Sequence, residues 1–189
     1  MPGQARSQET VTVILEASAR ILESVGLRGF NTNAIAARAG VSIGSLYQYF
    51  PNKDAILLAL IGSFEETFHD AVMKAVQEGR GQGLKPCLRL LVRALVTAHY
   101  HRPRLNRALE AEEERLGSGA DSAAFHASVL QLLRDHQDEV VVPVSRATEQ
   151  VLIAIVRAVV DLGLEADASP RSTEHRAMRA VCGYLLYAG

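Results

Sequence analysis

Apolar residues recur along this chain at the spacing of helices, and almost no segment alternates in the manner of a strand. In the first helical segment, Ile14, Ala17, Ile21, Leu22 and Val25 fall on one face. One further predicted helix holds Pro86 in its first turn and ends near residue 101. The other predicted helices cover about residues 7–25, 32–39, 43–49, 52–78, 103–114, 123–139, 146–162 and 170–187. The chain is therefore predicted to be all-α.

Residues that begin and end helices stand at the borders of these segments. Thr32, Ser42 and Asn52 are good N-terminal caps, because their side-chain oxygens accept a hydrogen bond from the first helical turn. Gly26 and Gly40 tolerate the left-handed conformation that often ends a helix. The glycine-rich stretch 79–83 is the clearest interior break and is expected to end the long helix from 52 to 78.

The overall composition excludes several classes of protein. Of 189 residues, 48% are hydrophobic, which suffices for a sizeable core. Cys87 and Cys182 are far apart and lack metal-type spacing, so we expect no disulfide scaffold, no metal and no cofactor. The N-terminus lacks the apolar core of a signal peptide, and the apolar run 151–160 is interrupted by Arg157 and too short to span a bilayer. A cytoplasmic protein without membrane contact is expected.

Charge is distributed unevenly, although the formal net charge is only −1. No acidic residue occurs between Glu23 and Asp54, whereas Arg28, Arg38 and Lys53 lie at or within these limits. This segment is locally positive, which suits a phosphate surface.

Within the acid-free segment, two short helices flank a glycine turn. Ala36 is small where the helices must cross, Gly40 permits the turn, and Val41 and Leu46 are expected to face inward. The remaining residues of the second helix and its rim face outward: Ser42, Ile43, Gly44, Ser45, Tyr47, Gln48 and Tyr49. Their hydroxyl groups can bond phosphate oxygens, and Gln48 can read a base edge. A helical hairpin whose tyrosines serve only for packing is the alternative interpretation.

The run of residues 35–57, IAARAGVSIGSLYQYFPNKDAIL, closely resembles the DNA-binding domain of the TetR family of transcriptional regulators. The preceding residues 26–30 also look like that family's link between its first two helices. The resemblance places Thr32, Ser42, Tyr47, Tyr49 and Lys53 on phosphate-contact positions. It places Ile43, Gly44, Ser45 and Gln48 on the groove-facing part of the recognition helix. Ile43 departs from relatives, which commonly carry a polar or basic residue there, and such an apolar side chain can touch a thymine methyl group.

By this resemblance, residues 1–52 form a three-helix DNA-binding domain with a helix-turn-helix, and residues 53–189 form a helical domain that binds an effector and dimerises. The helix at about 52–78 bridges the two. For dimerisation, the sequence offers a helix that is apolar nearly all round, followed by an apolar final helix. The expected interface residues are Val151, Ile155, Val159, Met178, Val181, Cys182 and Leu185. The alternative is that residues 151–160 form the central core helix of a monomer.

A small-molecule effector, apolar or aromatic, is expected in the helical domain. The candidate lining residues are Phe64, Phe68, His99, Leu105, Leu109, Phe125 and Val129. Ordinary core packing is the alternative role for each of them.

No catalytic constellation is recognisable, so the chain is not expected to be an enzyme. Glu66 and His69 form one Glu-x-x-His pair, but di-iron helical bundles need a second such pair, and none exists here. Glycine loops and nucleophile motifs of common enzymes are also missing from the sequence.

The sequence therefore predicts a homodimeric repressor that responds to a ligand and binds a palindromic operator in double-stranded DNA. Two alternatives stay open. One is a DNA-binding protein without an effector, whose helical domain binds other proteins. The other is a ligand-binding helical bundle whose helix-turn-helix is vestigial.

Overall fold

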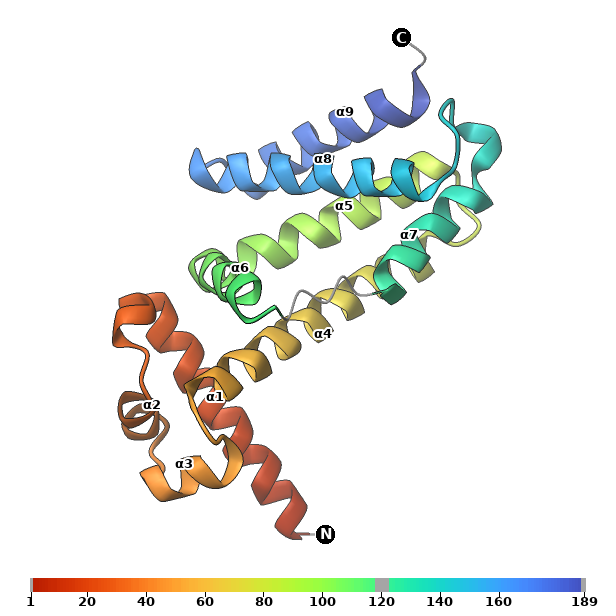
Figure 1. Cartoon of the computed structure of the whole chain (residues 1–189). Helices are drawn as coiled ribbons and strands as arrows, with labels where there is room; N and C mark the ends of the chain where they lie inside the picture. The colour runs from red at the N-terminus through yellow and green to blue at the C-terminus, as the bar shows by residue number, and fades with distance from the viewer. Residues whose placement is uncertain (1, 118–122, 188–189) are drawn as a thin grey trace. The chain divides into compact units, whose positions relative to one another are not determined.

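The computed structural model describes residues 2–117 and 123–187, and within these ranges the chain forms nine α-helices and no strand (Figure 1). The predicted all-α class is confirmed. The helices are α1 (Pro2–Gly29), α2 (Thr32–Ala39), α3 (Ile43–Tyr49), α4 (Lys53–Gly79), α5 (Leu84–His101), α6 (Pro103–Leu116), α7 (Ala123–Asp135), α8 (Arg146–Glu165) and α9 (Pro170–Leu186). A short 3-10 turn, Gln137–Glu139, follows α7.

Three predicted helix borders have clear local causes, whereas α1 continues past its predicted end to Gly29, with Gly26 at φ 65° inside it. Gly40 adopts φ 70° and ψ 25°, the left-handed conformation that ends α2. The Ser42 hydroxyl accepts a hydrogen bond from the Ser45 amide at 3.0 Å, and Oδ1 of Asn52 accepts one from the Ala55 amide at 2.8 Å. These two side chains therefore begin α3 and α4 as the sequence predicts.

One cap prediction was wrong. Asn31, rather than Thr32, caps α2, because its Oδ1 accepts the Ala34 amide at 2.9 Å. Thr32 is instead the first helical residue, and its hydroxyl lies 3.1 Å from the hydroxyl of Tyr47. The shift by one residue leaves the Thr32 side chain available to connect α2 with α3.

The chain divides into two compact units. The first comprises Met1–Glu65 with Arg102–Gly119, and the second comprises Glu66–His101 with Ala120–Gly189. Helix α4 contributes its beginning to the first unit and its end to the second. The assignment of residues 1–52 and 53–189 to separate domains stays a prediction, to which the structure adds that α6 lies in the first unit.

The core of the first unit joins α1–α3 with the start of α4 and with α6. Its fully buried aliphatic residues come from four of these helices: Ile14, Ile35, Leu46, Ile56 and Leu57. Leu105 and Leu109 of α6 are buried in the same cluster. The helix-turn-helix is thus held by packing on both α1 and α4, since two short helices alone bury too little surface to be stable.

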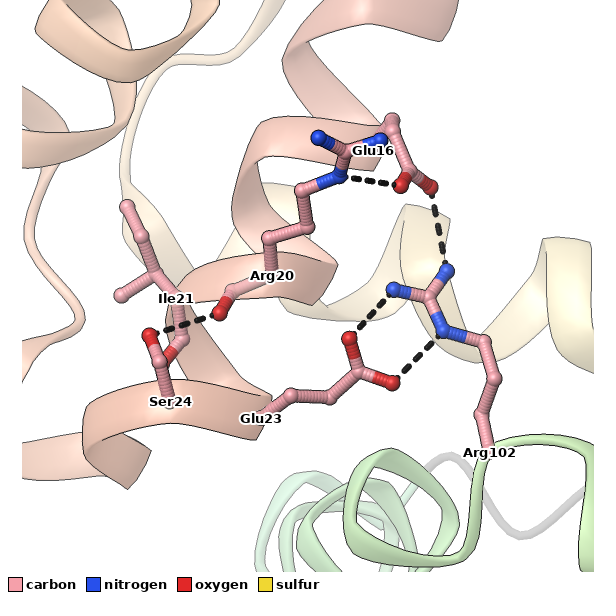
Figure 2. Close-up of polar contacts among 6 residues, drawn as sticks. All are labelled: Glu16, Arg20, Ile21, Glu23, Ser24 and Arg102. Atoms are coloured by element: carbon pink, nitrogen blue, oxygen red, sulfur yellow. Dashed lines mark hydrogen bonds and ion pairs between the residues drawn. The ribbon is translucent and has the colours of Figure 1, made fainter.

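Arg102 forms the main polar connection inside this unit (Figure 2). This residue immediately precedes α6, and its guanidinium group donates hydrogen bonds to both carboxylate oxygens of Glu23 at 2.6 and 2.7 Å. A third bond of 3.0 Å reaches Glu16, about two turns earlier on the same face of α1, where Arg20 also donates at 2.7 Å. The bidentate ion pair with Glu23 fixes the start of α6 against α1.

This arginine cluster predicts a pH-dependent contribution to stability. The hydrogen bonds from Arg102 hold the pKa of Glu23 below its usual value. Because the folded-state pKa is depressed, the stabilisation is present above the pKa of the unfolded state and is lost as the pH falls through the folded-state value. We expect Arg102→Gln to lower the free energy of unfolding by about 1–3 kcal/mol at pH 7. In urea titrations, the difference from the wild type should shrink between about pH 5 and pH 3; a constant difference would contradict the assignment.

The second unit contains α5, α7, α8 and α9, with the end of α4. Helices α8 and α9 lie side by side, and α5 packs against both (Figure 1). Gly163 of α8 lies close to both neighbouring helices, because an added Cβ atom would clash with Thr173 of α9 and would approach the Tyr100 hydroxyl of α5 to 2.7 Å. Across residues 2–117 and 123–187, no helix has the length and apolar character needed to cross a membrane.

Candidate nucleic-acid interface

The helix-turn-helix consists of α2, the Gly40 turn and α3. After Gly40, the Val41 amide donates to the Ala36 carbonyl at 3.1 Å, which closes the turn. Ala36 is buried where the two helices meet, and Leu46 is completely buried on the inner side of α3. Val41 is half-buried against the same core. The predicted inner face of the motif is thus confirmed, and the other side of α3 is available to solvent.

The outer side of α3 carries no charged group. Ile43 is 39% exposed and Tyr47 is 50% exposed, while Gly44 and Gln48 are also exposed. Ser45 is half-buried. Tyr49 is half-buried as well and packs against the core of the first unit, so the packing interpretation holds for this tyrosine and not for Tyr47.

Hydroxyl groups around α3 are joined in pairs. Ser42 and Ser45 share a hydrogen bond of 2.8 Å between their hydroxyl oxygens, in addition to the bond that caps the helix. Thr32 and Tyr47 share one of 3.1 Å between α2 and α3. The second pair places two hydroxyl groups from different helices at one point of the surface, where both can meet the same phosphate.

The electrostatic character of this surface follows from its neighbours. Arg28, Arg38 and Lys53 are exposed. The carboxylates that limit the acid-free segment on either side are both bound by arginines of the first unit: Arg102 holds Glu23 at 2.6 Å, and Arg115 holds Asp54 at 2.9 Å. Their negative charges are largely compensated, so the positive character of the segment is preserved.

The seven residues predicted to line an effector pocket are separated by the structure. Phe64, Leu105 and Leu109 pack in or against the core of the first unit. In the second unit, the Phe68 ring meets His99 edge-on at 5.5 Å between ring centres, and meets Phe125 at 5.7 Å. Nδ1 of His99 lies 2.8 Å from the Leu95 carbonyl, one turn earlier in its helix.

A small cavity of about 20 Å³ lies inside the second unit. This volume is on the scale of a single water molecule. Phe125 and Val129 of the predicted set line it, and the other lining residues are all aliphatic: Leu88, Leu91, Val92, Leu95, Leu152, Ile153, Val156 and Val181. The sequence prediction missed these eight, although the apolar repeat of α5 would have indicated half of them. In the described part of the chain, no three His, Cys, Asp or Glu side chains are placed to hold a metal ion.

The predicted dimer residues need a correction on α9. Met178, Val181, Cys182 and Leu185 are buried in the core of a single chain, so they present no surface to a second copy. These four residues pack in the core of the chain itself. On α8, Ile155 and Val159 are half-buried against this core, whereas Val151 is exposed. Other exposed apolar residues on α8 include Ala154, Ala158 and Leu162.

Comparisons with known proteins agree with this geometry. Residues 14–60 match the family model described as bacterial regulatory proteins, TetR family. The chain is 32% identical over 129 residues to a nucleoid occlusion factor, SlmA, from Shewanella halifaxensis, with 65% of this chain and 64% of the relative covered. It is 34% identical over 86 residues to the transcriptional regulator TtgR of Pseudomonas putida, with 46% and 40% covered. The chain thus spans no more than about two thirds of the length of these relatives.

A solved structure extends the likeness to the whole fold. The crystal structure of a TetR-family regulator from Mesorhizobium loti superposes with a TM-score of 0.77 over 93% of this chain and 95% of that one, at 18% identity. At this identity, the match concerns the fold.

Proposed function

The chain belongs to the TetR family of bacterial regulatory proteins and is a DNA-binding transcriptional regulator, and from this premise we propose that it is a homodimeric, ligand-responsive repressor. The observation that carries the proposal is the exposed outer face of α3, which lies in an acid-free, locally positive segment. Helix-turn-helix dimers bind two half-sites one helical turn apart, with a recognition helix in each major groove. A palindromic operator follows from this arrangement.

We assign the residues at this face to two roles. Thr32, Ser42, Tyr47 and Lys53 hold phosphate oxygens, since hydroxyl and ammonium groups donate to them. Tyr49 is left out of this set, because it packs against the core of the first unit. The residues that face the groove are Ile43, Gly44, Ser45 and Gln48. Phosphate contacts of this kind fix the position of the protein on DNA, whereas the groove-facing residues select the sequence.

Dimerisation through α8 is supported by an exposed stripe on this helix. Val151, Ala154, Ala158 and Leu162 are spaced by three or four residues, so they share one helical face, and each is exposed in the single chain. Small alanines between larger aliphatic ends allow two copies of α8 to approach closely. A two-fold axis beside this stripe would bury the same face of both subunits.

An apolar or aromatic effector is supported by the second unit. The aromatic contact of Phe68, His99 and Phe125 lies beside aliphatic side chains that also line the cavity. Because the cavity has only about the volume of a water molecule, an effector must separate these helices to enter. Phe68 belongs to α4, and the beginning of this helix is part of the DNA-binding unit. A displacement of α4 by the effector therefore also displaces residues of the DNA-binding unit, and operator binding becomes weaker. DNA then weakens effector binding by the same factor.

One alternative is favoured by the same small cavity. A DNA-binding protein without an effector needs no larger cavity, and relatives named nucleoid occlusion factors match over 129 residues, beyond the helix-turn-helix. For such a protein, the second unit is a surface for other proteins. An operator complex that no apolar small molecule dissociates would favour this alternative over the repressor.

The phosphate-contact assignment is tested with Lys53→Ala and Tyr47→Ala. Loss of a charged hydrogen bond to phosphate costs about 1.5–3 kcal/mol, so we expect at least a ten-fold weaker affinity for the operator with Lys53→Ala, together with a weaker salt dependence. Tyr47→Ala loses a hydroxyl contact and should weaken binding by several-fold.

Fluorescence anisotropy with DNA from the promoter of the protein's own gene is a suitable measurement. Lys85→Ala, at an exposed lysine of α5, is the matched control and should leave the affinity unchanged. If neither Lys53→Ala nor Tyr47→Ala weakens binding, the assignment is wrong.

A further inference from the structure

The side chains at the start of α3 differ in what they can still bind. Ser42 and Ser45 are engaged with each other through two hydrogen bonds, and Tyr47 is engaged with Thr32. Ile43 follows Ser42 as the first residue of α3, and 39% of its surface is exposed. Its aliphatic side chain lies at the N-terminal end of α3, and the N-terminal residues of a recognition helix are the ones that contact base edges.

The residues that follow Ile43 leave part of its side chain open to solvent. Gly44, the next residue, is exposed and has no side chain, and a Cβ atom added there would meet only the Ser42 hydroxyl, at 3.8 Å. The two larger groups on the same outer side, Tyr47 and Gln48, lie about one turn further along the helix. Ile43 is therefore free to approach the edge of a base pair.

The major groove offers an apolar side chain one matching group. Its edges carry hydrogen-bond donors and acceptors, and the C5-methyl group of thymine is its characteristic apolar feature. Cytosine methylated at C5 presents the same group at the same place. An isoleucine that met only donors and acceptors would desolvate them without replacing their hydrogen bonds.

We propose that Ile43 selects one pyrimidine C5-methyl group in each half-site. The inference rests on the proposed function, because it requires α3 to enter the major groove. The recognised chemistry is a methyl group on the pyrimidine ring, whose source is thymine or 5-methylcytosine. Ile43 is then the residue that sets specificity at this base pair, by burial of a methyl group rather than by a hydrogen bond.

The test changes single methyl groups on the DNA and leaves the protein intact. The probe is the duplex that the wild-type protein selects from a random library, and its thymines are replaced one at a time by uracil, which lacks only the methyl group. Burial of one methyl group is worth a factor of about four in affinity. We expect one thymine per half-site whose replacement weakens binding about four-fold, and about sixteen-fold when both half-sites are changed.

The matching protein variant links this loss to Ile43. Ile43→Ala should bind the thymine duplex more weakly than the wild type does. The variant should also bind the thymine duplex and the uracil duplex with equal affinity. Leu58→Ala, at a similarly exposed leucine of α4 (44% exposed), is the control and should keep the full preference for thymine. A thymine preference that Ile43→Ala retains overturns the proposal, as does a duplex in which no single uracil weakens binding.

Two further comparisons distinguish thymine from 5-methylcytosine as the source of the methyl group. They also distinguish failure of this inference from failure of the proposed function. With cytosine at the critical position, tighter binding of the 5-methylcytosine duplex supports recognition of the methyl group from either source. Equal binding of both cytosine duplexes, with the uracil effect present, supports recognition of thymine alone. If no duplex is selected from the library, the proposed function fails and this inference fails with it. Tight, selective binding without any uracil effect overturns the inference alone.

Discussion

Leu46→Ala is expected to destabilise the first unit by about 2–5 kcal/mol. Leu46 is completely buried on the inner side of α3 and belongs to the same core cluster as Ile14, Ile35 and Ile56. Alanine removes the buried methyl groups and leaves a cavity, because helices held on both sides collapse only partly. The loss is a large part of the stability of a small domain, which is commonly about 5–15 kcal/mol. Urea titration followed by circular dichroism measures it.

The matched control is the same substitution at an exposed leucine. Leu58→Ala, in the first part of α4, should change the free energy of unfolding by less than about 0.5 kcal/mol. Operator binding by Leu46→Ala should fall in proportion to the unfolded fraction, since the outer face of α3 is unchanged. Equal stability of the two variants would mean that α3 is not packed on this core.

A second large effect is expected for His126→Leu in the second unit. Nδ1 of His126 on α7 hydrogen-bonds Oε1 of Glu149 on α8, and the two residues are only 8% and 1% exposed. Removal of one partner leaves the carboxyl group of Glu149 buried without this contact. Leaving a buried group without its hydrogen-bond partner costs about 1–3 kcal/mol, and more when the group is charged.

The double variant distinguishes loss of pairing from loss of packing. When Glu149→Leu is added to His126→Leu, the uncompensated carboxyl group disappears, and most of the lost stability should return. The free energies of unfolding of the wild type, both single variants and the double variant form a complete cycle. Additive losses would show that the two side chains act independently and that their pairing contributes little.

Much of the fold was predictable because the relevant signals are local. Helical spacing of apolar residues, the left-handed Gly40 and the caps Ser42 and Asn52 each act within a few residues. The misplaced cap illustrates the limit of this approach. Asn31 and Thr32 are adjacent and both suit a cap, but Asn31 takes the cap while the Thr32 hydroxyl contacts Tyr47, fifteen residues away.

The interactions that sequence reasoning missed connect distant segments. Arg102 meets Glu16 and Glu23 across about eighty residues, and nothing near Arg102 identifies these partners. Similarly, Leu105 and Leu109 form an apolar face on α6. Their spacing does not indicate which core this face packs against, and the structure places it in the core of the first unit.

The same reason explains the error on α9. Met178, Val181, Cys182 and Leu185 form one apolar face, and a single helix shows the same pattern whether it covers its own core or a second subunit. Only the packing of α5 and α8 against α9 decides that this face is internal. The exposed stripe on α8 was less visible, because two of its four residues are alanines.

The central claim is that the outer face of α3 reads a DNA sequence, and a ratio of two affinities tests it most directly. The wild-type protein is titrated, at one physiological salt concentration, against its selected duplex and against a duplex of the same composition in scrambled order. The account predicts an affinity for the selected duplex that is higher by a factor of at least about 10³. Equal affinities for the two duplexes would contradict it, because they would leave only the sequence-independent attraction of a positive surface to phosphate.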